Sequence, residues 1–576
     1  MNPKGAPRSE QPDMNGSAPN VHRWSASYPA GVAQTVNTDA LVSLKELVEE
    51  AFRSEGAKVA LIQMGRRFTF AELDRYSLQF AAWLQSEGVR KGDRVAIMLP
   101  NVLQYGVVLC AAFRVGAVVV NINPLFTARE VQLQLEDSGA TVLVALANVL
   151  EAVAPVLART AVRRVCVTEV GDLLGGFKRL VVNRVARRGA GKRFAVIPCA
   201  IAWAEAVRRG SAETYVEVPV AGADLSFLQY TGGTTAAPKA AALTHANLCA
   251  NILQSQAWVK GALRPSGLAV TALPLYHIFA LEGNFLLFMR LGWSNLLIVN
   301  ARDVRGFVKE LGKYRPGFIS GVNTLFRALL STPGFTELDF SDLQIALTGG
   351  MDTSRTIAEE WSKVTGVALT QGWGLTECSP GVCINPPDAD FNGSVGVPMP
   401  STEVLVIGED GAEVAAGQIG ELCVKGPQVM SGYWKQAELT AQAFTADGWL
   451  RTGDLGRMDE RGFVFIVDRL SDVINVSGFK VYPNEVEAVA TERPDVAQAA
   501  AVAAIDERGD EKVALYVVPA AKEVDVAALL KHCRESLAPY KVPRQVHVRT
   551  ELPMSNVGKI LRKFLRPAPT VPPALG

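Results

Sequence analysis

The sequence has few cysteines, and their spacing gives no sign of two common uses of this residue. Eight cysteines are scattered over 576 residues, only Cys378 and Cys383 lie close together, and no CxxC pair occurs. The spacing therefore matches no zinc site, and a disulfide framework is implausible at this density. We expect a protein of a reducing, cytoplasmic compartment.

Long apolar runs are also missing. The longest apolar region, Val107 to Val120, is interrupted by Arg114 and falls short of the roughly 20 residues that a membrane-spanning helix needs. The first 21 residues are polar, rich in Pro, Gly, Ser and Asn, and lack the apolar core of a signal peptide. We therefore expect a loose N-terminal tail and no membrane span.

The sequence also lacks an excess of charge of one sign. The chain carries 58 Lys and Arg against 57 Asp and Glu, which gives a formal net charge of +1. This balance makes no general case for binding nucleic acid, and any basic surface must be local. We expect no nucleic-acid partner.

The sequence does contain short β-branched runs that alternate with amphipathic helical patterns. Strands are expected at 59–63, 94–99 and 117–121, and helices at 71–86 and 127–137. Such alternation predicts α/β layers with a largely parallel sheet. The length indicates about three or four domains or subdomains.

The pattern changes after about residue 400. Strand-like runs at 403–407, 420–424 and 462–468 indicate a small β-rich unit. From residue 472 we expect a compact α+β piece, with a helix after Pro483, strands at 499–503 and 513–518, and a helix near 526–537. The predicted fold class is α/β: a large N-terminal domain of α/β subdomains with a β-rich subdomain, then a small mobile α+β C-terminal domain. The expected bounds are a tail at 1–23, the large domain at 24–468, a hinge at 469–471, the small domain at 472–566 and a tail at 567–576.

One loop has the residue types of a phosphate site. A strand at 225–230 leads into the Thr- and Gly-rich segment 231–235, then Lys239, and a helix is expected to start near Thr244. Backbone N–H groups, hydroxyls and one cation can converge there on phosphate oxygens. The spacing is not that of a Walker loop. Taken alone, the segment fits a polar structural turn equally well.

Four further motifs decide between these readings. They lie at 371–378, at 448–455, at 468–469 with 477–483, and at 553–560. Together with the loop, in this order, they resemble the adenylate-forming superfamily of acyl-CoA synthetases, luciferases and peptide-synthetase adenylation domains. The resemblance extends from about Trp24 to Arg566. It is closest to bacterial long-chain fatty-acid–CoA ligases, through the segments 273–280, 321–326, 426–430 and 481–485.

The resemblance implies two half-reactions. A fatty acid, of medium to long chain, and ATP give an acyl-adenylate and pyrophosphate, and the thiol of CoA then displaces AMP. Two alternatives remain open. The acyl group could pass to a carrier-protein thiol, or the chain could be a catalytically impaired paralogue that binds nucleotide or lipid. A monomer and a homodimer are both compatible with the sequence.

The resemblance also assigns residues to ATP. Those assigned to the phosphate loop are Thr231, Gly232, Gly233, Thr234, Thr235 and Lys239. Thr376 would donate to the α-phosphate, and Glu377 would hold Mg²⁺, a hard cation that prefers oxygen ligands. Without its motif, Glu377 would be read as a surface carboxylate.

A further set of residues is assigned to the adenosine part of ATP. Gly349 and Gly350 would let adenine lie against backbone, and Gly372 and Gly374 are also assigned to ATP or AMP. Trp373 would stack on the base, where relatives usually carry Tyr. Asp454 would accept both ribose hydroxyls, and Arg469 would donate to the ribose and phosphate. By itself, the Thr-Gly-Asp run would be an ordinary turn.

The small domain would act in both half-reactions. Lys559 would bridge the substrate carboxylate and the α-phosphate during adenylation, although a Gly-Lys pair near a C-terminus is by itself a solvated charge. The domain would then rotate, so that the CoA-binding loop with Ser477, Gly478 and Lys480 replaces Lys559, a kind of step that can limit turnover.

The acyl group would be met by His277, Gly321 and Asn323. His277 could equally be a core histidine.

The chain also departs from its relatives in three ways, because Ala236 and Ala240 replace usual glycines and Ser471 replaces a frequent lysine. If either alanine required positive φ, the strain would cost about 1 kcal/mol or more.

The segment 173–194 is locally basic. It carries seven Lys or Arg between Lys178 and Arg193 and no acid. Phe177, Leu180, Val181 and Val185 would share one face if the segment is helical. This pattern fits docking on an anionic membrane surface, at the inner face of the membrane. A solvated basic helix fits it equally.

Overall fold

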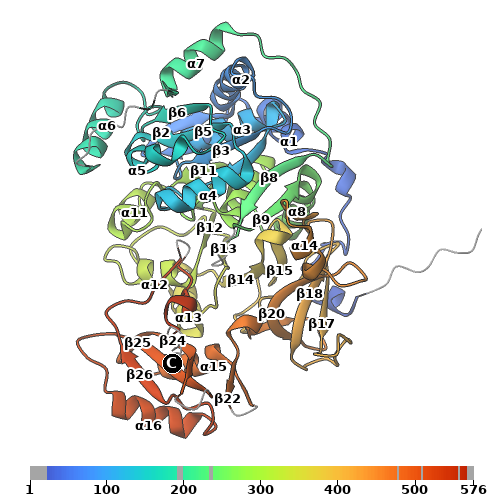
Figure 1. Cartoon of the computed structure of the whole chain (residues 1–576), viewed down its shortest axis with the longest axis vertical. Helices are drawn as coiled ribbons and strands as arrows, with labels where there is room; N and C mark the ends of the chain where they lie inside the picture. Colours follow the sequence, from blue (N-terminus) through green and yellow to red (C-terminus); the bar gives the residue numbers. More distant parts are fainter. Residues whose placement is uncertain are drawn as a thin grey trace, which may run out of the picture.

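The structure is a computed structural model that describes residues 22–190, 197, 199–231, 238–476, 479–506, 510–555 and 558–566. Figure 1 shows two large sheets with their helices, a β-rich subdomain in orange, and a small C-terminal domain in red at one end of the molecule.

The first sheet is parallel over most of its width. Its strand order is β19-β9-β8-β4-β3-β5-β6-β7. The bounds are β3 (Arg94–Met98), β4 (Val118–Asn121), β5 (Val142–Leu146), β6 (Arg164–Thr168), β7 (Ala200–Ala202), β8 (Leu225–Tyr230), β9 (Ala240–Thr244) and β19 (Gly432–Tyr433). Every residue of β4 and β5 is buried, as expected for parallel strands covered on both faces. Only β9 and β19 run antiparallel to their neighbours in the described part of this sheet.

The second sheet has the order β16-β15-β14-β13-β12-β10-β11-β1-β2. Its bounds are β1 (Val59–Gln63), β2 (Arg66–Thr69), β10 (Leu268–Thr271), β11 (Ser294–Leu297), β12 (Phe318–Gly321), β13 (Ile345–Thr348), β14 (Leu369–Gly374), β15 (Gly381–Ile384) and β16 (Val397–Pro398). The strands from β1 to β14 in this order are parallel, and both edges are antiparallel.

Helices cover these sheets. Their bounds are α1 (Leu44–Glu55), α2 (Phe70–Ser86), α3 (Leu103–Arg114), α4 (Ala128–Ser138), α5 (Ala147–Leu157), α6 (Gly176–Ala190), α7 (Trp203–Ala212), α8 (His245–Val259), α9 (Ile278–Ala280), α10 (Leu287–Arg290), α11 (Val304–Leu311), α12 (Asn323–Leu330), α13 (Arg355–Thr365) and α14 (Ala437–Ala443). Between α9 and α10 lies a π-helical turn, η3 (Leu281–Leu286). Short 3-10 turns are η1 (Arg23–Ser27), η2 (Thr38–Ala40), η4 (Thr376–Cys378), η5 (Leu470–Asp472) and η6 (Arg562–Phe564).

Helix α3 joins the two sheets. All twelve of its residues are buried, and it contacts β3 and β4 of the first sheet and β1 of the second. Side chains on a helix that is apolar all round are expected to be buried on every face. The whole apolar run at 107–120 is buried in the protein core. None of the helices in the described ranges combines the length and apolarity of a membrane span.

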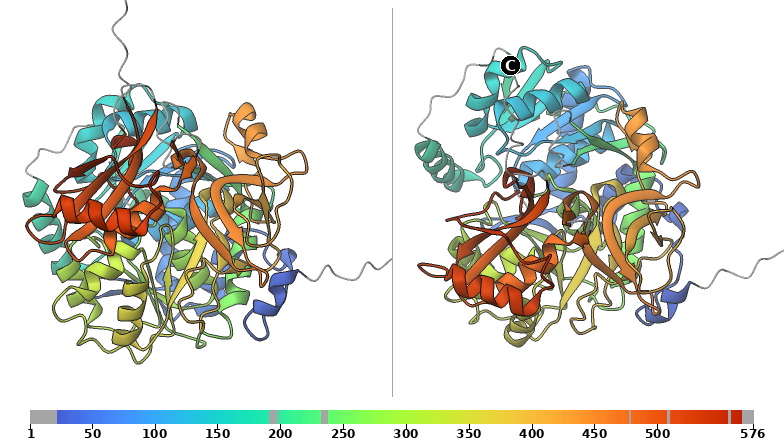
Figure 2. Two further views of the ribbon diagram at one scale, coloured as in Figure 1. Left: turned by 90° about the horizontal axis from the view of Figure 1, so that it is seen from below. Right: turned by 60° about the horizontal axis from the view of Figure 1, so that its bottom comes forward.

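The β-rich subdomain is an antiparallel sheet of β17 (Glu403–Ile407), β18 (Gly420–Lys425), β20 (Leu450–Met458) and β21 (Val464–Arg469). The chain then passes through η5 into the small domain. This domain comprises β22 (Ile474–Val476), β23 (Phe479–Val481), α15 (Pro483–Thr491), β24 (Val496–Ile505), β25 (Glu511–Pro519), α16 (Val526–Ser536) and β26 (Gln545–Val548). Its apolar side chains form a core of their own, with Val486, Leu515 and Leu529 at the centre. Figure 2 shows the small domain packed across the large one and beside the β-rich subdomain.

The predicted fold class is confirmed, and most predicted elements end within three residues of the observed ones. Strand β9 is one of the elements that were not predicted. Strand β9 lies between Lys239 and α8, so the phosphate loop closes a hairpin of β8 and β9 instead of leading directly into a helix. Helix α8 begins as expected after Thr244, whose hydroxyl caps it. The domain bounds drawn from the sequence stay predictions.

Candidate active site

A cavity of about 1350 Å³ lies where the two sheets, the β-rich subdomain and the small domain meet. Its wall includes residues of the phosphate loop and of the motifs at 371–378, 448–455, 468–469 and 553–560. Those that the sequence assigned to ATP and that line it are Thr231, Lys239, Gly349, Gly350, Gly372, Trp373, Gly374, Thr376, Glu377, Arg469 and Lys559.

The ends of the phosphate loop are held by the β8–β9 hairpin. The backbone N–H of Thr231 donates to the carbonyl of Lys239 at 3.0 Å. Gly232, Gly233, Thr234, Thr235 and Ala236 lie outside the described residues. Ala240 is a buried strand residue paired with Tyr230, and its φ is not positive. The strain considered for Ala240 is therefore absent.

Lys239 and Glu377 lie close together beside Tyr433, a residue that was not predicted from the sequence. Lys239 Nζ lies 3.7 Å from Glu377 Oε1 and 3.9 Å from the ring centroid of Tyr433. The Tyr433 hydroxyl donates to the same Glu377 oxygen at 2.7 Å. Burial, followed by the Glu377 charge, raises the pKa of Tyr433. Tyr433 follows the motif at 426–430, but nothing in its spacing pointed to the site.

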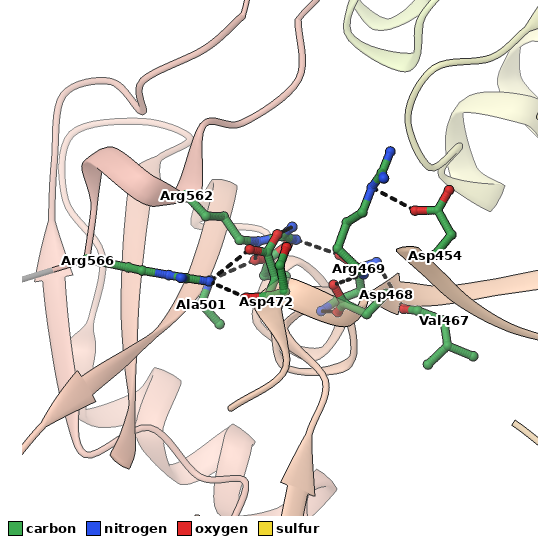
Figure 3. Close-up of polar contacts among 11 residues, drawn as sticks. Asp454, Val467, Asp468, Arg469, Asp472, Ala501, Arg562 and Arg566 are labelled. Atoms are coloured by element: carbon green, nitrogen blue, oxygen red, sulfur yellow. Dashed lines mark hydrogen bonds and ion pairs between the residues drawn. The ribbon is translucent and has the colours of Figure 1, made fainter. Parts of the chain in front are cut away.

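The proposed ribose acceptor is buried and already paired. Asp454 is 4% exposed, lies opposite Arg469 in the β20–β21 ladder, and contacts Arg469 Nε at 2.6 Å (Figure 3). The indole N–H of Trp373 donates to its other oxygen at 3.0 Å. Burial raises the pKa of Asp454, while Arg469, Lys559 and the Trp373 hydrogen bond oppose the rise. The two oxygens that would accept ribose hydroxyls are thus held in place by the residues assigned to the base and phosphate.

Close approaches explain two of the glycines. A Cβ on Gly349 would lie 3.2 Å from the carbonyl oxygen of Gly372, which sits on the neighbouring strand. A Cβ on Gly374 would lie 2.1 Å from the carbonyl oxygen of Pro380. Gly374 is therefore needed where β14 turns toward β15, whether or not adenine touches it.

Lys559 reaches the cavity from the small domain. A turn holds it, since the Ser555 N–H donates to the Lys559 carbonyl at 2.7 Å and the Lys559 N–H donates to Ser555 Oγ at 3.0 Å. Burial, followed by the charge of Arg469, lowers the pKa of Lys559, and Asp454 opposes this. Two segments about one hundred residues apart in sequence thus bring their charges to one place.

The residues assigned to CoA lie elsewhere. Lys480 is exposed and paired with Glu409 of the β-rich subdomain. Ser477 and Gly478 fall outside the described residues. The described arrangement therefore places Lys559, and not Lys480, in the cavity wall.

The three residues assigned to the acyl group have different surroundings. His277 lines the cavity, and its ring nitrogen accepts from the Phe279 N–H at the start of α9. Burial lowers the pKa of His277 to about 4. Gly321 packs on Phe326, and the side-chain Oδ1 of Asn323 accepts from the Ser354 N–H at 3.2 Å. The described wall includes their neighbour Val322, and the acyl assignment of all three stays a prediction.

An arginine network anchors the start of the small domain (Figure 3). Arg562 donates to Glu487 at 2.7 and 2.9 Å, and Arg566 donates to Asp472 and to the Ser471 carbonyl. Burial raises the pKa of Asp468 to about 6, against the N–H of Asn484 and the charge of Arg562. The backbone of Ser471 is therefore used in the network, although its side chain replaces the frequent lysine.

Family models match both parts of this chain. Residues 48–434 match the AMP-binding enzyme family, and residues 485–559 match the AMP-binding enzyme C-terminal domain. The chain therefore belongs to the AMP-binding enzyme family.

Individual relatives cover nearly the whole chain. It is 48% identical over 549 residues to a long-chain-fatty-acid–CoA ligase of Salmonella typhimurium, covering 94% of this chain and 97% of the relative. It is 42% identical over 551 residues to one of Haemophilus influenzae, covering 94% and 98%. Among solved structures, ATP-bound MatB from Rhodopseudomonas palustris matches with a TM-score of 0.79 and 26% identity, covering 91% of this chain and 98% of that one.

Proposed function

We propose that this enzyme activates a fatty acid of medium to long chain with ATP and transfers the acyl group to CoA. The observation that carries the proposal is the convergence of Lys559 on the site formed by Asp454, Arg469, Lys239 and Glu377. The names of the bacterial relatives support the acid and the thiol. Neither a carrier-protein acceptor nor a non-catalytic role is needed to account for these features.

The first half-reaction joins two anions. A carboxylate oxygen of the acid attacks the α-phosphorus of ATP, the bond to the β-phosphate breaks, and pyrophosphate leaves. Lys559 stabilises the negative charge that gathers at the α-phosphorus, with Arg469 beside it. Such oriented charges often lower a barrier by about 3–4 kcal/mol per group. Thr231 and Lys239 hold the departing phosphates.

The second half-reaction needs a different neighbour. The CoA thiol loses its proton, its sulfur attacks the acyl carbonyl carbon, and AMP leaves. Lys559 occupies the cavity wall, so the small domain must move to admit the thiol. The loop with Ser477, Gly478 and Lys480 takes its place in this account.

Glu377 fits a magnesium ion. Mg²⁺ is usually bound through one or two carboxylates together with substrate phosphates. Glu377 lines the cavity beside Lys239, where the phosphates of ATP would lie. When bound, Mg²⁺ would neutralise phosphate charge. Tyr433 holds one oxygen of the carboxylate in a fixed position.

Helix α6 forms a docking surface for an anionic membrane, at the inner face. Phe177 and Leu180 are 81% and 68% exposed, and Val185 is also exposed. Figure 1 shows α6 at the rim of the molecule, away from the small domain. Arg187 and Arg179 pair with Glu169 and Asp172, while Arg184 is exposed on the same helix. A fatty acid dissolved in the membrane would be collected there.

The test is pyrophosphate release with fatty acids of six to eighteen carbons, with and without CoA. Sustained release that requires both an acid and CoA, together with an acyl-CoA product, is the expected result. A single burst that CoA does not prolong would contradict CoA as acceptor. No release with any acid would contradict the proposal as a whole.

A further inference from the structure

One buried carboxyl in the cavity wall has no task in the reaction described above. Glu282 lies on η3, between α9 and α10, and is 3% exposed. Its Oε1 atom is fully buried and has no hydrogen-bond partner among the described residues. A buried polar atom without a partner is costly and calls for an explanation.

The part of the cavity around Glu282 is apolar. Helix α8 contacts η3, and Ser255 and Val259 are one turn apart on α8 and line the wall with Glu282. Val259, Leu287 and Phe318 belong to one hydrophobic cluster and also line the cavity. An apolar wall of this kind is what an acyl chain requires, so Glu282 lies where the chain of the substrate would pass.

The backbone at this point is unusual. Residues Leu281–Leu286 form a π-helical turn inside an otherwise α-helical segment. Such turns are rare in proteins overall, but many of them lie at functional sites, because they change the direction of a side chain relative to the regular helix. Gly283, next in sequence, has the side chain of Phe279 as its nearest neighbour, at 3.6 Å from an added Cβ. Gly283 and Glu282 both line the cavity.

The carboxyl is held in its neutral form. Burial raises the pKa of Glu282 to about 8, and a hydrogen bond with the Ser255 side chain opposes the rise. A protonated carboxyl has an O–H donor and an acceptor oxygen. It can pair with a hydroxyl group in either direction, whereas a methylene chain leaves its Oε1 atom unpaired.

We propose that Glu282 recognises a hydroxyl group on the acyl chain, so that the enzyme prefers hydroxylated fatty acids over unsubstituted ones. This inference rests on the proposed function, because it places the acyl chain in the cavity. It goes further, since it assigns a specificity-determining residue and a substrate class.

The experiment compares hexadecanoic acid with its monohydroxy isomers, with the hydroxyl moved from C2 to the terminal carbon. Each isomer competes with the unsubstituted acid in one reaction, and the two acyl-CoA products are measured by mass spectrometry. The ratio is independent of the fraction of folded enzyme. We expect at least one isomer to be preferred by about tenfold or more, since a site built to hydrogen-bond a hydroxyl disfavours the analogue without it.

Three variants separate this role from a structural one. Glu282→Leu should abolish the preference for the hydroxy acid and favour the unsubstituted acid. Glu282→Gln retains a donor and an acceptor and should keep the preference. Val259→Ala reshapes the same wall and should also keep it, because the hydrogen-bonding group remains.

Two results would overturn the inference. One is a wild-type enzyme that prefers the unsubstituted acid over every isomer. The other is a preference that Glu282→Leu leaves unchanged. In either case conversion of hexadecanoic acid would leave the proposed function standing, whereas no acyl-CoA from any acid would overturn both.

Discussion

At the scale of single residues, the proposed adenylation step depends most on Lys559. It is the cation that the small domain contributes to the buried site of Asp454 and Arg469. Lys559→Ala should lower acid-dependent pyrophosphate release by about 100-fold or more, because a charge positioned at the transition state is lost. Conversion of pre-formed acyl-adenylate to acyl-CoA should be far less affected.

The matched control is Lys531→Ala. Lys531 is an exposed lysine of the same domain, 3.9 Å from Glu535, and its removal should leave both half-reactions intact. Equal loss of the two half-reactions in Lys559→Ala, or no loss in either, would show that Lys559 has a different role.

Glu282 makes stability depend on pH. Its pKa is about 8 in the folded chain against an ordinary 4.5, so between these values the folded protein holds a proton that the unfolded chain has released. The free energy of unfolding therefore falls as pH rises from about 4.5 to about 8. Glu282→Gln removes this term. As pH rises through this range, we expect the melting temperature of Glu282→Gln to rise relative to that of the wild type. Above this range the difference between the two melting temperatures should stay constant. Parallel curves would show that Glu282 does not titrate in this way.

The sequence could predict that certain residues lie together, because their motifs bring specific side-chain types in a specific order. Lys239, Glu377 and Lys559 line one cavity, and Asp454 contacts Arg469 in the same wall; their chemical roles stay predictions. Tyr433 and Glu282 could not be found in this way, because their positions depend on packing between segments far apart in the chain. Gly374 differs again, because its motif assigned it to the nucleotide, whereas the structure requires a glycine there to avoid a clash with the Pro380 carbonyl.

At the scale of elements, α6 presents the exposed apolar side chains of Phe177, Leu180, Val181 and Val185. Phe177→Asp and Leu180→Asp should each lower binding to vesicles containing anionic lipid by about tenfold, since each removes apolar area and adds a repelled charge. Cosedimentation with anionic and with zwitterionic vesicles measures this. Val216→Asp changes a similarly exposed apolar residue outside α6, 65% exposed, and should bind as the wild type does. Loss of binding in none of the variants, or in all three, would rule out α6 as the docking surface.

Strands and helices were predictable where the apolar pattern was regular. Strands β1 and β17 match their predicted ranges, and α2 and α8 begin at threonines that cap them. Strand β9 was missed because Ala240 to Thr244 has little β-branched character and follows directly on Lys239. Its pairing with β8 depends on the tertiary context, as strand formation often does.

At the scale of the whole molecule, the two domains meet at Gly558. Its φ is +80°, and an added Cβ would lie 2.7 Å from Thr324 Oγ1 of α12. Gly558→Ala should therefore lower pyrophosphate release by about tenfold, through strain of about 1–3 kcal/mol and a collision between the domains. The step from acyl-adenylate to CoA should change less, because Lys559 then leaves the site.

Two variants test whether the collision is responsible. Gly411→Ala has a similar φ of +79° but nothing within 4 Å of its added Cβ, so it should leave pyrophosphate release unchanged. Adding Thr324→Ala to Gly558→Ala should restore part of the rate. No recovery in the double variant would show that the strain at Gly558, and not the contact between the domains, limits the reaction.

The most direct test of the account follows oxygen atoms. A fatty acid labelled with ¹⁸O at both carboxylate oxygens is converted with ATP and CoA, and the products are weighed by mass spectrometry. If the carboxylate attacks the α-phosphorus and the thiol displaces AMP, one label appears in AMP and one remains in the acyl-CoA. Unlabelled AMP, or ADP with the label in inorganic phosphate, would contradict adenylation by this site.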